Sequence, residues 1–542
     1  MTDAFTPDEQ LILARYFTNS DQGVFGLVNL PEVVKGALFA RYSRSPKSLR
    51  RLFLDEFHRD PARGVAALAE AEVAPREAMG QNRAEKLYEK VFTEYGDDSV
   101  AQLGGAHLAC EDITNVLTKI IERPRLASYL EQSTRYIVYD QRREGDGHWK
   151  FRAPDEIADP ALRGEFYAVM DGLFTFYARL VRELQARYEE VFPRDDKTPL
   201  APWQASIRAK ACDVARGLLP AAVLSNVGVY ASGQAYEMML LRMFAHPLAE
   251  ARECAASILA ELRKIIPAFL RRVDMPERGG RWSAYFADVH ARMTETVAAL
   301  DLSRLGSRPE VDLVAWDPAG EDKVAAAALF EYTDAPSGAL EAEVATLPAD
   351  AKAAILAAYV GERTNRRHRP GRAFERTDYK FDCVTDYGCF RDLQRHRMLT
   401  IDWQPLGTSL GHKLPEDLAL VPGSADEWTR HMDRAAALAE RVRAQHGTLV
   451  AQYGVPFAYK IRFTMQMNAR EAMHLLELRT QEQGHTEYRR VCNRMFELIR
   501  DKAGHRALAG AMKYIDPASY DLGRLHAEKR THAKLEAQQA GA

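Results

Sequence analysis

Two segments of the chain resemble each other, and this similarity constrains the fold more than any other feature. The first, RPRLASYLEQSTRY, covers residues 123–136, and the second, RHRMLTIDWQPLGT, begins at residue 395. Both start with Arg-x-Arg, and both have a hydroxyl residue at the sixth position, Ser128 in the first and Thr400 in the second. Each follows a pattern typical of an apolar helix and precedes a second arginine-containing cluster further along. Such a repeat predicts two similar domains in tandem.

Length and composition fit two domains of an ordinary soluble protein. A chain of 542 residues is too long for a single hydrophobic core. Its formal net charge of −3 gives no sign of the basic surface expected for nucleic-acid binding. The first residues have neither the basic nor the apolar region of a signal peptide, and no apolar run has the length of a membrane span. We therefore expect a cytoplasmic protein with no nucleic-acid or membrane partner.

The cysteines are scattered and form no Cys-x-x-Cys pair. Most of them lie in patterns typical of helices or strands, so we expect buried reduced thiols, no disulfides and no metal site. The six positions are Cys110, Cys212, Cys254, Cys383, Cys389 and Cys492.

Helical patterns dominate the chain. The sequence Pro7-Asp8-Glu9 predicts the start of a first helix, because acidic residues favour a helix N-terminus. Apolar residues at three- and four-residue steps predict long helices over 163–190, 245–273 and 425–450. Short apolar runs predict strands over 136–140, 311–316 and 457–467.

A domain boundary is predicted near residues 300–310. A helical pattern ends there, and the chain from 311 reads as a strand, an Asp-Pro-Ala-Gly turn and a helix, which is a natural start of a domain. We therefore expect one domain at 1–305, with a helical N-terminal extension, and a second at 306–542. Within the second, the polar stretch GERTNRRHRPGR (361–372) predicts an exposed basic loop.

The first repeated segment concentrates hydrogen-bonding groups. Arg123, Arg125, Glu131, Ser133 and Arg135 occupy odd-numbered positions, so an extended segment would turn them all to one side. Arginine offers a planar fork of donors suited to phosphate or carboxylate. One interpretation is an anion-binding cleft, because the flanking residues are apolar. The alternative is a solvated segment whose acidic and basic groups pair with each other, and the residues alone leave both open.

The second repeated segment places a histidine between two arginines. Arg395 and Arg397 would lower the pKa of His396 and favour its neutral form. A neutral imidazole can accept a hydrogen bond or offer a stacking surface.

The stretch MNAREAMHLLELR (467–479) has the pattern of a helix. Asn468 and Arg479 are three turns apart and share a face, and Arg470 and His474 lie at i, i+4 on a neighbouring face. They could bind a ligand, or Asn468 could cap the helix while Arg470 forms a salt bridge. Glycine-rich phosphate loops are absent, which disfavours an ordinary Rossmann or P-loop enzyme.

Residues 123–136 resemble the signature of the flavin-dependent thymidylate synthases, Arg-His-Arg followed by Ser and then by Glu-x-Ser-x-Arg-Tyr. Pro124 replaces the signature histidine and Leu130 the usual asparagine. The upstream block 95–103 resembles the family's segment ending in Glu-His, with Gln102 and Leu103 in place of that pair. The matching positions are Arg123, Arg125, Ser128, Glu131, Ser133, Arg135 and Tyr136.

The two halves depart from the family pattern in complementary ways. The second half keeps Arg-His-Arg at 395–397 and the helix with Asn468, but Trp403 stands at the signature glutamate. The first half keeps the Glu-x-Ser-x-Arg loop and a segment with Arg216, whereas its Asn-x-Arg element is replaced by Ser232-Gly233-Gln234. In the family, active sites are shared between subunits of a homotetramer with FAD between them. The resemblance therefore implies a composite site made from two incomplete halves, and a homodimer that mimics the tetramer.

The resemblance also implies a fold and a reaction. The fold is α+β and helix-rich, with two tandem thymidylate-synthase-complementing-type domains, each a small antiparallel sheet flanked by long helices. The reaction is methylation of dUMP to dTMP with FAD, methylenetetrahydrofolate and NADPH. The alternatives are a divergent flavoenzyme acting on another pyrimidine nucleotide, and a non-catalytic nucleotide-binding homologue.

Residue roles follow from the same resemblance. Arg135 and Arg479 would be catalytic. The implied substrate-binding residues are Glu131, Gln132, Ser133, Arg135, Arg216, Arg242 and Arg479. The implied cofactor-binding residues are Arg123, Arg125, Arg395, His396, Arg397, Asn468, Arg470 and His474.

Overall fold

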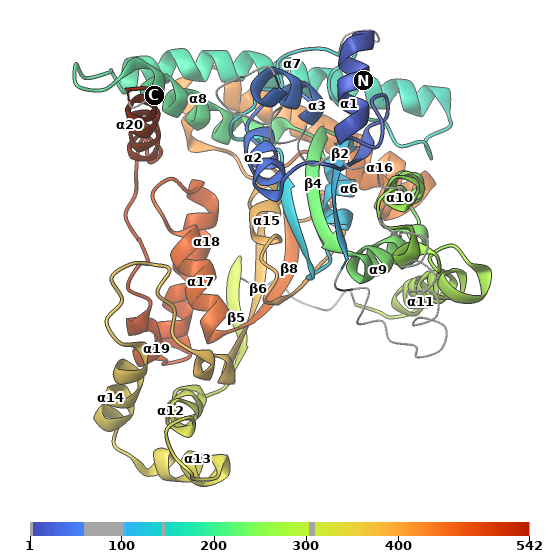
Figure 1. Ribbon diagram of the computed structural model, residues 1–542. Helices are drawn as coiled ribbons and strands as arrows, with labels where there is room; N and C mark the ends of the chain where they lie inside the picture. Colours follow the sequence, from blue (N-terminus) through green and yellow to red (C-terminus); the bar gives the residue numbers. More distant parts are fainter. Residues whose placement is uncertain (1–3, 59–101, 103, 144–146, 303–308, 541–542) are drawn as a thin grey trace. The chain divides into compact units, whose positions relative to one another are not determined.

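The computed structural model describes residues 4–58, 102, 104–143, 147–302 and 309–540 (Figure 1). It consists of two compact units. Unit 1 contains residues 1–178, 218–305 and 430–455, and unit 2 contains 179–217, 306–429 and 456–542. The two longest helices, α7 (Pro160–Val191) and α16 (Ser424–Ala451), each have residues in both units. The predicted domains 1–305 and 306–542 stay a prediction.

Each unit contains one four-stranded antiparallel sheet, and the two sheets have the same strand order. The first has the order β1-β2-β4-β3 and the second β5-β6-β8-β7. The strands are β1 (Val24–Leu27), β2 (Gly105–Thr114), β3 (Ala127–Glu131), β4 (Leu224–Ser232), β5 (Val311–Trp316), β6 (Asp378–Asp386), β7 (Thr400–Trp403) and β8 (Lys460–Asn468). The two repeated segments supply β3 and β7, which hold the same edge position. This confirms the predicted α+β fold with two similar halves.

Helices cover both faces of the sheet in unit 1. On one face, the Cys254 thiol of α10 lies within hydrogen-bonding reach of the Cys110 thiol of β2. On the other, the ring of Phe39 in α2 stacks on His107 with 6.1 Å between ring centroids. Cys110 and His107 are three residues apart in one regularly paired strand, so their side chains point to opposite faces. The helices of this unit include α1 (Pro7–Tyr16), α2 (Glu32–Tyr42), α3 (Leu49–Leu52), α6 (Asn115–Ile121), α9 (Gly233–Phe244), α10 (Ala249–Arg263) and α11 (Arg281–Ala298).

The N-terminal segment is more than the helical extension that we expected. The first helix begins where predicted, with the Thr6 hydroxyl accepting from the Glu9 amide and the Glu9 carboxylate accepting from the Thr6 amide. The same segment supplies strand β1, which pairs with β2. The absence of a side chain at Gly228 in β4 lets Phe39 of α2 approach closely, because a Cβ there would lie 2.3 Å from the ring.

In unit 2 the helices α17 and α18 lie against the sheet (Figure 1), with α17 contacting β6 and β8 and α18 contacting β5. Asn468 is the last residue of β8 and the N-cap of α17, so the strand leads directly into the helix. The helices of this unit include α8 (Leu200–Ala215), α12 (Gly320–Phe330), α13 (Ser337–Thr346), α14 (Ala349–Val360), α15 (Tyr387–Leu393), α17 (Ala469–Arg479), α18 (Thr486–Glu497), α19 (Arg506–Ala511) and α20 (Leu525–Ala540).

The long predicted helices are present, with local differences. The pattern over 163–190 is α7, and the pattern over 425–450 is α16, which is interrupted at Gly447 by a positive φ of 81°. The pattern over 245–273 instead gives the shorter α10 and then a 3₁₀ turn. Pro267 begins that turn, because proline cannot continue the preceding helical hydrogen bonding.

One predicted strand is wrong. Residues 311–316 form β5 as predicted, and the run from 457 contains β8. Residues 136–140, however, form no strand. The amides of Tyr136 and Ile137 both donate to the Ser133 carbonyl, at 3.2 and 3.3 Å, so the chain turns there.

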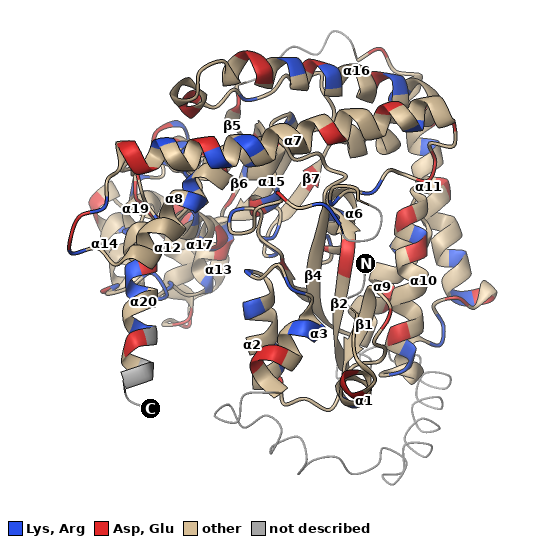
Figure 2. Cartoon of the chain, turned by 90° about the horizontal axis from the view of Figure 1, so that it is seen from above, with Lys and Arg blue, Asp and Glu red and all other residues tan. Residues whose placement is uncertain are grey.

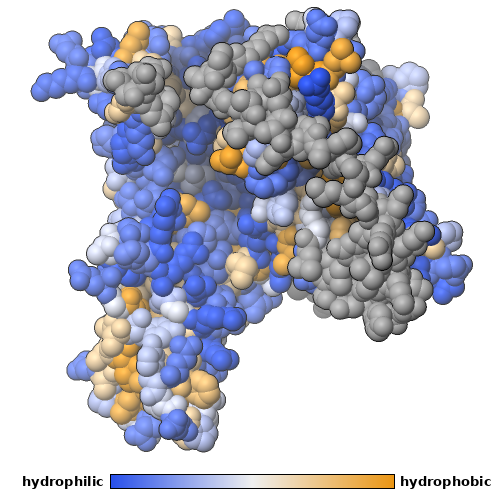
Figure 3. Space-filling view, in the orientation of Figure 1, coloured by the Kyte–Doolittle hydropathy of each residue, from blue (hydrophilic) through white to orange (hydrophobic). Residues whose placement is uncertain are grey.

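Charge and hydrophobicity are distributed differently over the helices. Charged residues of both signs are spread along α7 and α16 (Figure 2). Hydrophobic residues gather at the surface over α12, α13 and α14 (Figure 3), where Phe330 is 49% exposed. Within the described residues, no helix combines the length and the apolar character that crossing a bilayer requires. All six cysteines lie among the described residues, and they are buried free thiols, as predicted.

Candidate functional site

The candidate site in unit 2 is centred on the end of α17. Arg479, the last residue of this helix, donates from Nε to Nε2 of His396 at 2.9 Å. Its Nη2 donates to the Asp392 carbonyl of α15 at 2.5 Å. The helix after β6 and the helix after β8 therefore bring the second Arg-His-Arg segment and the terminal arginine together, as the sequence suggested.

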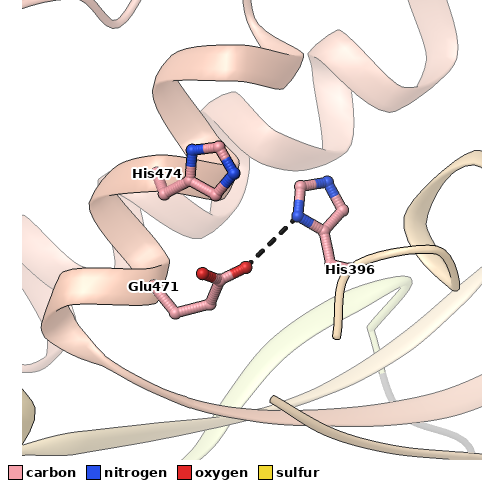
Figure 4. A group of neighbouring side chains, drawn as sticks. All are labelled: His396, Glu471 and His474. Atoms are coloured by element: carbon pink, nitrogen blue, oxygen red, sulfur yellow. Dashed lines mark hydrogen bonds and ion pairs between the residues drawn. The ribbon is translucent and has the colours of Figure 1, made fainter. Parts of the chain in front are cut away.

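The hydrogen bonds of His396 define its tautomer. Arginine can only donate, so Nε2 of His396 is the acceptor and carries no hydrogen. Its Nδ1 then carries the hydrogen and donates to the Glu471 carboxylate at 3.2 Å (Figure 4). Burial lowers the pKa of His396 well below its usual value, and the nearby charge of Arg479 lowers it further. The ring is neutral, as predicted, but burial outweighs the flanking arginines as the cause.

Glu471 and His474 complete this cluster on the first turns of α17. Burial raises the pKa of Glu471 to about 7. Burial also lowers the pKa of His474 to about 4, with further contributions from Arg369 and Arg366. At pH 7 the Glu471 carboxyl is therefore only about half ionised, and His474 is neutral.

The types and spacing of His396, Glu471 and His474 would also suit a metal ion, since one ligand atom from each lies within 4.8 Å of the others. The electrostatics oppose this reading. Nδ1 of His396 carries a hydrogen, and the positive charges of Arg369 and Arg479 act on the cluster. The neighbouring arginine charges therefore act against binding of a cation at this cluster.

Arg216 also belongs to unit 2, although it lies in the first half of the sequence. It follows α8, is 4% exposed, and its Nη1 lies 3.6 Å from the Asp392 carboxylate. The same carboxylate pairs with Arg395 at 2.6 Å. Among the described residues, Nη2 of Arg216 has no hydrogen-bond partner. Three predicted arginines, Arg216, Arg395 and Arg479, thus meet around Asp392, which the sequence did not single out.

Two predicted cofactor residues have structural roles. Asn468 is the N-cap of α17, and its Oδ1 accepts from the Glu471 amide at 2.9 Å. Arg470 donates from Nε to the Pro370 carbonyl at 3.0 Å, and its Nη1 lies 3.5 Å from the Glu375 carboxylate. These are the contacts that the cap-and-salt-bridge alternative predicts, and any role in ligand binding stays a prediction.

In unit 1, Glu131 is engaged inside the fold. Its carboxylate pairs with Lys119 at 3.2 Å and accepts from the Thr118 hydroxyl at 3.3 Å. Lys119 also pairs with Glu122 at 2.6 Å, and all three charged side chains are buried. Glu131 therefore shares one buried lysine with a second carboxylate.

The loop after β3 is held by residues 43–45, a segment that no sequence pattern singled out. The Gln132 amide nitrogen Nε2 donates to the Ser45 carbonyl at 2.8 Å, and the Ser133 backbone amide donates to the Ser43 carbonyl at 3.1 Å. The guanidinium of Arg44 lies 5.1 Å from the ring centroid of Tyr136.

Arg135 differs from our expectation of an arginine exposed in a cleft. It is only 8% exposed, and its backbone amide donates to the Ser133 hydroxyl at 3.3 Å. Because the residue is buried, we expect its removal to be costly for the fold.

The remaining predicted residues do not join these groups in the way that the sequence suggested. Only 127–131 of the first repeated segment is extended, so its odd-numbered polar residues do not share one side. Arg123 and Arg125 precede that strand and are exposed, as is Arg397 in unit 2. Arg242 is exposed on α9, with its guanidinium 5.7 Å from the Phe286 ring centroid. The block 95–103 lies outside the described residues, apart from Gln102.

The basic loop at 361–372 is more than an exposed loop. Arg363 is buried and forms a salt bridge with Glu477 at 2.6 Å. The sequence gives no signal that separates Arg363 from the other arginines of this stretch.

Comparison with known proteins identifies the family. The family model described as thymidylate synthase complementing protein matches residues 54–268 and 312–504. A UPF0159 protein of Chlamydia pneumoniae is 36% identical over 532 residues, which cover 97% of this chain and 98% of the relative. A UPF0159 protein of Thermoplasma acidophilum is 31% identical, over 92% of this chain and 99% of the relative.

A more distant relative carries a functional name. A flavin-dependent thymidylate synthase of Clostridium tetani is 25% identical over 224 residues, 39% of this chain and 82% of that protein. The first family match contains β2, β3 and β4, and the second contains β6, β7 and β8. The chain therefore belongs to the thymidylate synthase complementing protein family, of which it is a tandem-duplicated and divergent member.

Proposed function

We propose that the chain is a flavin-dependent thymidylate synthase-like enzyme, which methylates dUMP to dTMP with FAD, methylenetetrahydrofolate and NADPH. The family matches and the name of the Clostridium tetani relative support this reaction class. The complementary losses in the two halves support a composite site in which each half supplies what the other lacks. A homodimer that mimics the family's tetramer completes the proposal.

The observation that carries the proposal is the hydrogen bonding of Arg479. Among the described residues, Arg479 donates its hydrogen bonds to two neutral acceptors, Nε2 of His396 and the Asp392 carbonyl. These bonds orient the guanidinium without cancelling its charge. Such a group can stabilise negative charge that develops on a pyrimidine ring, as preorganised donors do in other enzymes.

The residues of unit 2 fit an anionic nucleotide such as FAD or dUMP. Nη2 of Arg216 and Nδ1 of His474 are buried atoms without a hydrogen-bond partner among the described residues. A buried polar atom left unpaired costs about 1–3 kcal/mol. Oxygen atoms of a bound nucleotide would accept from Arg216 and remove its share of that cost.

The chain's residues divide the work as follows in this proposal. Ser133, Arg135 and Arg216 bind the phosphate of dUMP, and Arg479 polarises its ring. FAD is held by the Arg-His-Arg segment at 395–397 and by α17. When bound, FAD supplies the redox chemistry, and the protein needs no nucleophile of its own.

A second candidate is a flavoenzyme acting on another pyrimidine nucleotide. Trp403 stands where the family signature has a glutamate, and it packs against Phe390 with 5.4 Å between ring centroids. An indole in place of a carboxylate changes the shape and charge offered to the base. A non-catalytic nucleotide-binding homologue is the third reading.

One set of measurements separates these readings. The spectrum of the purified protein, before and after addition of FAD and then dUMP, reports flavin binding. Formation of dTMP from dUMP with methylenetetrahydrofolate and NADPH, and rescue of a thymidine-requiring bacterial strain, report the specific reaction. Bound flavin without dTMP formation would favour the second candidate. A colourless protein that takes up no FAD would refute both flavoenzyme readings.

A further inference from the structure

The basic loop, residues 361–372, is fastened to α17 at its start. Arg363 forms two hydrogen bonds with the Glu477 carboxylate, at 2.7 and 2.6 Å, and both side chains are 1% exposed. Its Nη1 also donates to the Ala511 carbonyl at 2.6 Å. A bidentate salt bridge of this kind fixes the orientation of the guanidinium as well as its distance from the carboxylate. Arg363 therefore anchors the loop and is not available to a ligand.

The rest of the basic loop is fastened as well. Nε of Arg363 donates to the His368 carbonyl at 2.5 Å, which closes the loop on itself. Arg470, near the start of α17, donates to the Pro370 carbonyl at 3.0 Å. Because Glu477 and Arg470 both lie on α17, this helix holds the loop at two points. The segment between them is presented in a defined position.

The segment between Arg363 and Pro370 carries two arginines whose charges act on Glu471 and His474 of α17. Arg369 and Arg366 both lower the pKa of His474, after the larger effect of burial. Arg369 also acts on Glu471. The two arginines therefore lie within electrostatic range of the face of α17 that carries His474.

The positive charge of the loop is poorly compensated. Burial lowers the pKa of Arg366, and the charges of Arg369 and Arg367 lower it further. Glu477 opposes this effect, but its carboxylate is bound to Arg363. Crowded like charges are relieved most by a ligand with more than one negative charge.

We infer that Arg366 and Arg369 of the basic loop, together with His474 of α17, form a binding site for a diphosphate group. The fastened loop supplies two planar forks of donors, and Nδ1 of His474 is a buried polar atom with no partner among the described residues. The inference rests on the proposed function only in assigning this group to FAD.

The experiment measures binding of inorganic pyrophosphate to the full chain by calorimetry at two salt concentrations. The double variant Arg366→Ala/Arg369→Ala is compared with the matched control Arg367→Ala, which removes a neighbouring exposed arginine from the same loop. We expect affinity to fall at least about tenfold in the double variant and to stay within about twofold in the control. Salt dependence should weaken in the double variant, because fewer charges contact the ligand.

A second double variant guards against a folding defect. Arg366→Lys/Arg369→Lys keeps both charges but loses the planar forks, so we expect an intermediate affinity. Equal pyrophosphate affinity in the parent and the alanine variant, an equal loss in the Arg367→Ala control, or no binding to the parent would each overturn the inference.

Flavins then separate this inference from the proposed function. We expect the alanine variant to lose FAD affinity and to keep riboflavin affinity, because riboflavin carries no phosphate. If pyrophosphate binding depends on the two arginines but the parent binds no flavin, the diphosphate site stands and the proposed function falls. If the alanine variant binds FAD as tightly as the parent, the loop does not contact the cofactor and the assignment to FAD is wrong.

Discussion

Nε of Arg479 donates to Nε2 of His396 at 2.9 Å, and this contact determines the state of both side chains. The histidine must be the neutral tautomer with its hydrogen on Nδ1, and the guanidinium is aimed by an uncharged acceptor. A carboxylate in place of His396 would also have oriented the Arg479 guanidinium, but it would have neutralised its charge. The pair keeps a positive charge oriented inside a largely buried cluster.

Lysine at position 479 should therefore fail to replace arginine. An ammonium group cannot reproduce the fork that reaches both His396 and the Asp392 carbonyl. In the proposed reaction we expect Arg479→Lys to lower the rate of dTMP formation about 10²–10³-fold, the range for loss of one preorganised donor. Arg494→Lys, at an exposed position on α18, is the control and should leave the rate unchanged. A normal rate for Arg479→Lys would remove this residue from the chemistry.

The raised pKa of Glu471 makes stability depend on pH. Its folded pKa is about 7 and its unfolded value 4.5, so the folded state holds the proton more tightly. The stabilisation is complete below about pH 4.5 and is lost as the pH rises through 7. Relative to Glu471→Gln, the wild-type free energy of unfolding should fall across this window by up to about 3 kcal/mol.

Urea titrations of the wild type and of Glu471→Gln at pH 5 and pH 7.5 measure this change in the free energy of unfolding. His396 and His474 have lowered pKa values, so the stability linked to them is lost in the opposite direction, as the pH falls below 6.5. Both histidines are present in both proteins, and their contribution largely cancels in the difference. A difference that does not change with pH would show that Glu471 is ionised in the folded protein.

Removing the buried anchor of the basic loop should destabilise unit 2. Arg363→Met leaves the Glu477 carboxylate buried without its salt-bridge partner, which costs about 3–5 kcal/mol. The double variant Arg363→Met/Glu477→Leu should recover part of this loss, because neither charge then remains. Arg494→Met, which breaks an exposed pair with Glu497, should cost less than about 1 kcal/mol. Urea unfolding measures all three, and a double variant no better than the single one would contradict the account.

Arg135→Ala should affect both nucleotide binding and the fold. The resemblance to the flavin-dependent thymidylate synthases assigns Arg135 to the substrate site, so we expect the affinity for dUMP to be lost. Because Arg135 is buried, we now also expect a loss of about 1–3 kcal/mol in the free energy of unfolding. Titration with dUMP under conditions where the variant is folded tests the first effect. Unchanged affinity for dUMP would remove Arg135 from the substrate site.

Close packing of α2 on the first sheet can be tested at one glycine. A Cβ added at Gly228 would lie 2.3 Å from the Phe39 ring, so Gly228→Ala should cost about 1–3 kcal/mol through overpacking. Gly164 in α7 has no atom within 4 Å of such a Cβ, and Gly164→Ala should stabilise by about 0.5–1 kcal/mol. Thermal unfolding of the two variants should therefore shift in opposite directions.

Sequence patterns predicted those elements whose local signals agree with their packing. The helix after Thr6, the long α7 and strand β5 carry strong caps or periodicity, and each is where the sequence placed it. The run YIVYD reads as a strand, yet its backbone turns because Tyr136 and Ile137 bond back to Ser133. Its apolar residues are buried by tertiary packing, which local patterns do not report.

Part of the candidate site was predicted from residue types, and the part that depends on tertiary contacts was not. Residue types drew attention to Arg216, His396 and Arg479, and the structure brings all three to unit 2. Their common neighbour Asp392 was missed, because an aspartate on a short helix has no distinguishing spacing. The same holds for Arg363, whose importance comes from a partner more than a hundred positions away in the sequence.

The identical strand order of the two sheets has an evolutionary consequence. In an assembly of identical subunits, every substitution appears in every copy, so no copy can specialise. Joining two copies in one polypeptide fixes their ratio at one to one and lets each accumulate its own changes. One half of such a chain can lose a function that the other half retains. The two halves then depend on each other.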